Sequence, residues 1–159
     1  MCYINSGDSM RLGFASDHRG YELKEKLTNY FSDNGYSIID YGTNDSISCD
    51  YPDYAYKLGT GIINGEVDYG IAICGTGIGI SIALNKMHGI YCAKVCNIDE
   101  AFHTRNDNNT NCIAFGEKMN YDDAIKIIET FIRTNYSNLE KHNRRNDKIK
   151  QIENGEYNG

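Results

Sequence analysis

Short apolar runs alternate along this chain with longer segments whose apolar residues recur every three or four positions. The runs predict five strands, at residues 11–16, 37–41, 69–74, 90–96 and 111–115. The helical spacing predicts helices at about 20–34, in a segment ending near 65, from about 78, at 98–105, after Asn120 and at about 139–153. Strands that alternate with helices pair in parallel through right-handed crossovers. The pattern therefore predicts an α/β fold, an open parallel sheet covered by helices on both faces.

The first helix shows the spacing most clearly. Leu23, Leu27, Tyr30 and Phe31 fall on one stripe, and Gly35 suits the left-handed position that commonly ends a helix. Near the other end of the chain, an asparagine that can cap a helix precedes a second stripe of the same kind, formed by Ala124, Ile127, Ile128 and Phe131.

Length and composition fit one domain. With 159 residues, 40% of them apolar, the chain can bury a core, and no apolar run approaches the ~18 residues of a membrane helix. The first ten residues lack the basic start and apolar core of a secretory signal, so we expect a cytoplasmic protein. We expect an extension at 1–10, one domain at 11–153 and a frayed tail at 154–159.

The net charge and the cysteines restrict the kinds of partner and ligand that the chain can bind. A net charge of −6 argues against nucleic acid and membrane surfaces, but a small anionic substrate needs only a local cluster of donors. The six cysteines include no Cys-x-x-Cys, and the four histidines are not spaced as zinc partners, so we expect no metal. Cys92 and Cys96 share one side of the fourth predicted strand, which indicates small buried hydrophobes.

Parallel sheets bind ligands beyond the carboxyl ends of their strands, so the residues at these positions are the candidates for a binding site. The first strand is followed by Asp17, His18 and Arg19, which together can grip hydroxyls and an anion. An equally good reading has Asp17 capping the helix while the other two face solvent.

The third strand runs into Cys74-Gly75-Thr76-Gly77-Ile78-Gly79-Ile80-Ser81. Glycines at alternate positions let the backbone turn tightly and present amides at a helix N-terminus, which favours an anion there. The same features favour a thiolate. A thiolate beside such amides suits abstraction of a proton α to a carbonyl, because the amides can hold the enediolate oxygen.

Other glycine-rich sites fit this turn less well. A phosphate-loop NTPase places a lysine after the last glycine, and a cysteine-dependent phosphatase an arginine six residues after its cysteine, but Ile80 stands at both places. A dinucleotide fold has its glycine turn after the first strand. A buried structural cysteine remains the alternative interpretation.

Two polar segments follow. Residues 101–111 carry several side chains suited to hydroxyl recognition, although asparagine-rich turns are also ordinary loops. On the last helix, Lys141 and Arg145 are four residues apart and can clamp a phosphate, although a solvated charged face is the more usual explanation of such a run.

At these places together the chain resembles the ribose-5-phosphate isomerase B family, which also includes the galactose-6-phosphate isomerase subunits. The resemblance covers about residues 11–152. It is carried, in chain order, by Ser16-Asp17-His18-Arg19-Gly20, Asp50-Tyr51-Pro52, Gly65-Glu66-Val67-Asp68, the turn that begins at Ile73-Cys74, Asn85-Lys86 and Lys141-His142-Asn143-Arg144-Arg145.

The resemblance implies a single Rossmann-like domain with a C-terminal dimerisation helix. It implies a homodimer or tetramer whose active sites are shared between subunits, each completed by the partner's last helix. It also implies an intramolecular oxidoreductase without metal or cofactor. Such an enzyme interconverts ribose 5-phosphate and ribulose 5-phosphate, in the pentose phosphate pathway, through a cis-enediolate.

The resemblance also assigns roles. Cys74 is the base that moves a proton between C1 and C2, with Thr76 nearby. One branch of the family has a glutamate base at the position of Ser81, so this chain falls in the cysteine-base branch. The implied substrate-binding residues are Asp17 for hydroxyls, His18 and Tyr51 near the phosphate end, Gly75, Gly77, Ile78 and Gly79 for the oxyanion, Asn108 for the reacting oxygens, and Lys118, Lys141 and Arg145 for the phosphate.

The chain departs from the family in two ways. The ring-opening histidine aligns with Asp107, which can move a proton at the ring oxygen only if its pKa is raised. His103, one helical turn earlier, is the alternative. Lys118 and Lys141 replace two phosphate-binding arginines and so lose the bidentate fork.

Three other functions stay open at this point. The first is isomerisation of a six-carbon sugar phosphate such as allose 6-phosphate or galactose 6-phosphate. The second is non-catalytic sugar-phosphate binding, because the ring-opening position is altered. The third, more distant, is a Rossmann oxidoreductase.

Overall fold

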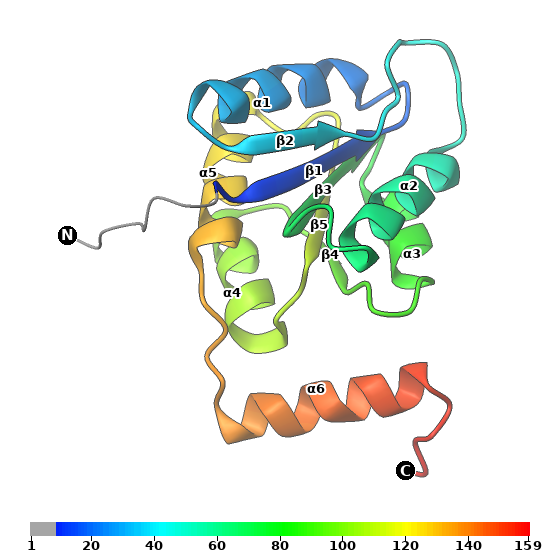
Figure 1. Ribbon diagram of the computed structural model, residues 1–159, viewed down its shortest axis with the longest axis vertical. Helices are drawn as coiled ribbons and strands as arrows, with labels where there is room; N and C mark the ends of the chain where they lie inside the picture. Colours follow the sequence, from blue (N-terminus) through cyan, green and yellow to red (C-terminus); the bar gives the residue numbers. More distant parts are fainter. Residues whose placement is uncertain (1–8) are drawn as a thin grey trace, which may run out of the picture.

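The structure is a computed structural model that describes residues 9–159. The predicted extension at 1–10 therefore lies almost entirely outside the described residues. Elements alternate along the chain as expected (Figure 1). The strands are β1 (Arg11–Ser16), β2 (Ser37–Asp40), β3 (Tyr69–Cys74), β4 (Cys92–Lys94) and β5 (Cys112–Gly116). The helices are α1 (Tyr21–Asp33), α2 (Tyr51–Ile63), α3 (Ile78–Asn85), α4 (Ile98–Asn108), α5 (Tyr121–Arg133) and α6 (Glu140–Glu153).

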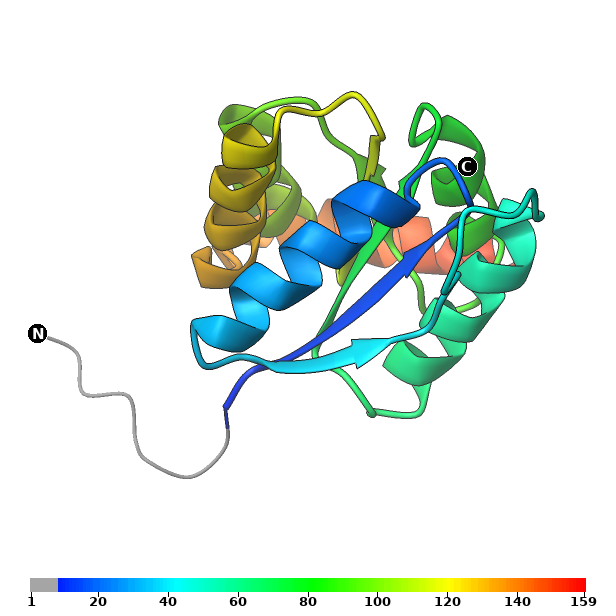
Figure 2. The same ribbon diagram turned by 90° about the horizontal axis from the view of Figure 1, so that it is seen from above.

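The five strands form one parallel sheet in the order β2-β1-β3-β5-β4, which confirms the predicted fold. Helices cover both faces (Figure 2). Two predicted helix signals are also present. Gly35 adopts a φ of +90°, and the Asn120 side chain accepts hydrogen bonds from the amides of Asp122 and Asp123.

Two boundaries differ from the prediction. The fourth strand is shorter than expected and ends before Cys96, because β4 is an edge strand that pairs only with β5. Cys92 is buried as predicted, but Cys96 is exposed, so its assignment as a buried hydrophobe is wrong. Helix α4 runs three residues beyond the predicted end, to Asn108, where Asn109 in the left-handed conformation ends it.

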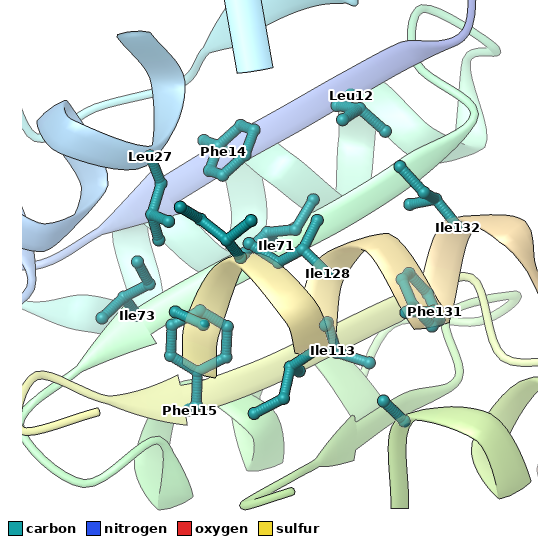
Figure 3. Packing of buried hydrophobic residues seen from close by; sticks show 14 of the residues in the cluster. Leu12, Phe14, Leu27, Ile71, Ile73, Ile113, Phe115, Ile128, Phe131 and Ile132 are labelled. Atoms are coloured by element: carbon teal, nitrogen blue, oxygen red, sulfur yellow. The ribbon is translucent and has the colours of Figure 1, made fainter. Parts of the chain in front are cut away.

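The two faces of the sheet carry side chains of different size. One face buries large residues against α1, α4 and α5 (Figure 3). The other face buries small residues against α2 and α3. The large strand residues are Leu12, Phe14, Ile71, Ile73, Ile113 and Phe115, and the small ones are Ala15, Ala72, Cys74, Cys112 and Ala114. Cys74 thus lies in the layer of small side chains beneath α2 and α3.

Helix α6 lies outside these layers (Figure 1). Among its residues only His142 is buried. It contacts α4 near its start, and at its end the Glu153 carboxylate accepts hydrogen bonds from the Gly89 amide at 3.2 Å and the Tyr91 hydroxyl at 2.9 Å. A cavity of about 490 Å³ lies between α6 and the body of the domain. Within residues 9–159, no helix combines the length and the apolar character needed to cross a membrane.

Candidate active site

Cys74 is the last residue of β3, and its sulfur lies inside the glycine turn. Its Sγ accepts a hydrogen bond from the Gly77 amide at 3.1 Å, and the residue is 4% exposed. Gly77 has a φ of +78°, and a Cβ on it would lie 2.7 Å from the backbone of Phe115. Only glycine fits both requirements. The turn therefore has the predicted arrangement of a thiol against a main-chain donor at the start of a helix.

The next residues complete the first turn of α3. The Thr76 hydroxyl accepts a hydrogen bond from the Ile78 amide at 3.2 Å, while the Ser81 hydroxyl donates to the Ile78 carbonyl at 2.7 Å. Gly79 lies under the ring of Tyr51, since a Cβ there would come within 2.5 Å of the tyrosine Cζ. Tyr51 therefore covers the same helix end that presents the amides.

Asp17 lies beside this turn. It is 6% exposed, and its Oδ1 accepts hydrogen bonds from the amides of Arg19 at 3.0 Å and Gly20 at 3.1 Å. These bonds lie in the turn before α1, whose N-cap is Gly20 with no side-chain cap bond, so the interpretation of Asp17 as the helix cap is not confirmed. The backbone also brings Asp17 to the end of β3, because its amide donates to the Ile73 carbonyl at 3.3 Å.

His18 has a partner that the sequence did not reveal. Its Nδ1 accepts a hydrogen bond from the Cys49 amide at 3.2 Å, and the Cys49 sulfur lies 4.0 Å from the same nitrogen. Cys49 belongs to the polar loop before α2, which no periodicity distinguishes. The bond ties that loop to the turn after β1.

Glu117 is a second residue that the sequence reading missed. Its amide donates to the Cys74 carbonyl at 2.8 Å, and its Oε1 accepts a hydrogen bond from the Arg19 Nε at 2.9 Å. It follows β5 at the carboxyl edge of the sheet, so an inspection of every strand end would have found it. Lys118, exposed, comes next in the chain. Cys74, Asp17, His18, Tyr51 and Lys118 therefore gather at one edge.

Asp107 and Asn108 lie at the opposite edge of the sheet. Helix α4 starts after the end of β4 and finishes before the start of β5, and its 11 residues span about 16 Å. The Asn146 amide group of α6 donates to the Asp107 carbonyl at 2.9 Å, and its Oδ1 accepts from Asn108 at 3.1 Å. Lys141 and Arg145 lie on this same helix, and both are exposed.

Asp107 does not have the raised pKa that it would need, according to the sequence analysis, to open the sugar ring. Its pKa is lowered, first by the hydrogen bond from the Asn106 amide group at 2.7 Å and then by His103. The condition stated for Asp107, a raised pKa, is therefore not met. The His103 Nδ1 lies 3.1 Å from Asp107 Oδ2, and the His142 Nε2 lies 3.7 Å from Oδ1. Asp107 is an ionised carboxylate between two imidazoles.

Comparison with known proteins identifies the family. Residues 12–149 match the family model described as Ribose/Galactose Isomerase. The chain is 37% identical to ribose-5-phosphate isomerase B of Escherichia coli over 144 residues, 90% of this chain and 96% of that protein. It is 42% identical to the putative sugar phosphate isomerase YwlF of Bacillus subtilis over 111 residues, 69% of this chain and 74% of that protein.

A solved structure gives the same result. The Clostridium thermocellum ribose-5-phosphate isomerase B superposes with a TM-score of 0.89 at 40% identity, covering 92% of this chain and 99% of that one. The sheet, the helices on both faces and the sequence motifs therefore agree. The chain belongs to the ribose/galactose isomerase family, and it is a sugar isomerase.

Proposed function

We propose that this chain interconverts ribose 5-phosphate and ribulose 5-phosphate, with Cys74 as the proton-transferring base. The observation that carries the proposal is the hydrogen bond from the Gly77 amide to the Cys74 sulfur, at the N-terminal end of α3. A main-chain donor and a helix end both stabilise a thiolate. Relatives named ribose-5-phosphate isomerase B and sugar phosphate isomerase supply the substrate class.

The geometry supports a simple proton transfer. The Cys74 thiolate takes the proton from C2 of the open-chain aldose, which leaves a cis-enediolate with its charge on the C1 oxygen. Amides of the Gly75–Gly79 turn stabilise that charge. The thiol then returns the proton to C1 while the C2 hydroxyl proton passes to the C1 oxygen, and the ketose forms.

The proposed roles of the other substrate-binding residues depend on the edge of the sheet at which each residue lies. Asp17 and His18 contact the sugar, Tyr51 covers the N-terminal end of α3, and Lys118 binds phosphate at the same edge. The roles of Asn108, Lys141 and Arg145 need a second copy of the chain, because these residues lie at the opposite edge of their own sheet. Within residues 9–159, neither Lys141 nor Arg145 has an ion-pair partner, and both are free to bind a phosphate.

Ring opening is assigned to His103. Its Nδ1 lies 3.1 Å from Asp107 Oδ2, so the carboxylate orients the imidazole. The pair does together what the family's single histidine does at the position of Asp107.

The test is deuterium incorporation from solvent into ribose 5-phosphate. Wild-type enzyme is expected to exchange the proton at the reacting carbon, whereas Cys74→Ala exchanges it at least ~10²-fold more slowly. A Cys112→Ala variant serves as the matched control, because it removes another buried thiol from the same face of the sheet and leaves the glycine turn unchanged. Wild-type exchange rates in Cys74→Ala would refute the cysteine base. Parallel assays with allose 6-phosphate and galactose 6-phosphate measure the substrate preference.

A further inference from the structure

An ion pair bridges two strand ends directly beside Cys74. Arg19, in the turn after β1, donates through Nε and Nη2 to the same oxygen of Glu117, which follows β5. The two residues are 98 positions apart in the sequence. The pair therefore exists only because the fold brings the ends of β1 and β5 to either side of β3.

The cation of this pair lies over the turn that holds the sulfur. A Cβ on Gly75 would lie 3.1 Å from the Arg19 Cζ and from its Nη1. The absence of a side chain at Gly75 therefore leaves the space that the guanidinium fills. Gly75 directly follows Cys74, so the guanidinium packs against the residue next to the thiol.

The anion of the pair is fixed to the same strand end. The Glu117 amide donates to the Cys74 carbonyl at 2.8 Å, so its backbone cannot move away from β3 without losing that bond. Its carboxylate raises the pKa of the Arg19 guanidinium, and Cys74 contributes in the same direction. The arginine therefore responds to the charge on the sulfur as well as to that on the carboxylate.

Other ionisable groups surround the end of β3. They come from the turn after β1, the segment after β5 and the start of α2, and they are Asp17, His18, Arg19, Glu117, Lys118 and Tyr51. Asp17 is committed to the amides of Arg19 and Gly20, and His18 to the Cys49 amide. Arg19 is the cation that packs against the turn itself.

We propose that Arg19 is a positioning residue for the isomerase reaction. Its guanidinium stabilises the Cys74 thiolate, and Glu117 holds it over Gly75 and limits how much positive charge reaches the sulfur. This inference rests on the proposed role of Cys74 as the base. It assigns opposite effects to the two members of one ion pair: the arginine promotes ionisation of the thiol, and the glutamate restrains it.

The experiment measures alkylation of Cys74 by iodoacetamide near neutral pH, resolved by peptide mass spectrometry. Glu117→Gln is expected to raise the rate about threefold and Arg19→Gln to lower it about threefold, the scale of a screened charge a few ångströms away. Cys96 is the internal standard for alkylation. It is exposed, and its sulfur accepts a hydrogen bond from Lys94 at 3.0 Å. Arg11→Gln is the matched control, since it removes an arginine from an exposed ion pair at the opposite end of β1.

Opposite shifts in the two variants, with Arg11→Gln unchanged and kcat following the alkylation rate, support the proposal. A purely structural ion pair predicts the same change in both variants, and that result, or no change in either, overturns it. The readout does not need turnover. If Cys74→Ala abolishes proton exchange while both variants alkylate like wild type, only this inference fails. If Cys74→Ala keeps full exchange, the assignment of the base fails, and the catalytic meaning of Arg19 with it.

Discussion

Among single residues, Asp107 bears most directly on the proposal that His103 opens the sugar ring. The carboxylate lies 3.1 Å from the Nδ1 of His103, one helical turn away, and its pKa is lowered. A carboxylic acid with a lowered pKa is a poor proton donor near neutral pH. An imidazole held by that carboxylate is a good one, so the proton at the ring oxygen is expected to move through His103.

We therefore expect His103→Ala to reduce turnover of ribose 5-phosphate at least ~10-fold, as loss of a general acid–base does. Asp107→His is expected to preserve or raise turnover, because it restores an imidazole at the aligned position. Initial rates of both variants check this. His88→Ala, a change at an exposed histidine after α3, is the control. An unaffected His103→Ala enzyme would exclude His103 from ring opening.

Single-residue chemistry was predictable only where the sequence marks a strand end. Cys74 and Asp17 follow apolar runs directly, so the sequence indicated both. Glu117 also follows a strand and was overlooked there, whereas Cys49 has no such signal; the contacts of the two residues join turns 98 and 31 positions apart. No local pattern encodes such contacts. The pKa of Asp107 likewise depends on its neighbours, and Asn106 and His103 lower it.

At the scale of elements, the docking of α6 depends on few bonds. Its end is held by the Glu153 carboxylate, which accepts from the Tyr91 hydroxyl and the Gly89 amide. Burial, and then the hydrogen bond with Glu153, raises the pKa of Tyr91 to about 12. The folded protein therefore favours the neutral phenol over the phenolate. In the unfolded chain the tyrosine pKa has its ordinary value of about 10, so the phenolate forms at lower pH there.

This difference predicts a pH-dependent stability. The contribution of Tyr91 is complete below pH about 10 and is lost as pH rises towards about 12, because the phenolate cannot donate to Glu153. Thermal unfolding of wild type and Tyr91→Phe measures it. The Tm of wild type is expected to fall more steeply across that window than the Tm of the variant. Parallel curves would show that Tyr91 does not couple α6 to the domain.

The elements themselves were largely predictable, since strand and helix periods differ and each segment is long enough to show one of them. The errors fall where the period fades. Polar residues at the end of α4 hid its last three positions, and the edge position of β4 shortened a run that looked longer in sequence. Tertiary pairing sets both boundaries, and local composition carries little of that information.

At the scale of the whole molecule, the candidate residues of one chain form two groups at opposite edges of the sheet. The first contains Cys74, Asp17, His18, Tyr51 and Lys118, and the second contains His103, Asp107, Asn108, Lys141 and Arg145. The proposed site needs residues of both groups, and we expect different copies of the chain to supply them. The exposed apolar residues Ile149 and Ile152 on α6, and Leu139 just before it, support an expected dimer in which this helix meets a partner.

Mixing two inactive variants tests the shared site. Cys74→Ala and Arg145→Ala are each expected to have little activity. If sites are shared, a mixed dimer contains one site in which both residues are intact. Equal amounts exchanged at random are then expected to recover about a quarter of wild-type activity. Mixing Cys74→Ala with Lys118→Ala, whose changes lie at the same edge, is expected to give no gain. No recovery in the first mixture would place the complete site within one chain.

The unequal faces of the sheet limit how this enzyme can change. Cys74 stands in a layer of alanines and cysteines, with α2 and α3 pressed close against it. An ionisable side chain larger than a thiol would push those helices outward, so a carboxylate or imidazole base cannot simply replace the sulfur there. A base larger than a thiol would have to come from a neighbouring helix. The close packing of α2 and α3 therefore restricts the proposed base at this position to a side chain as small as a thiol.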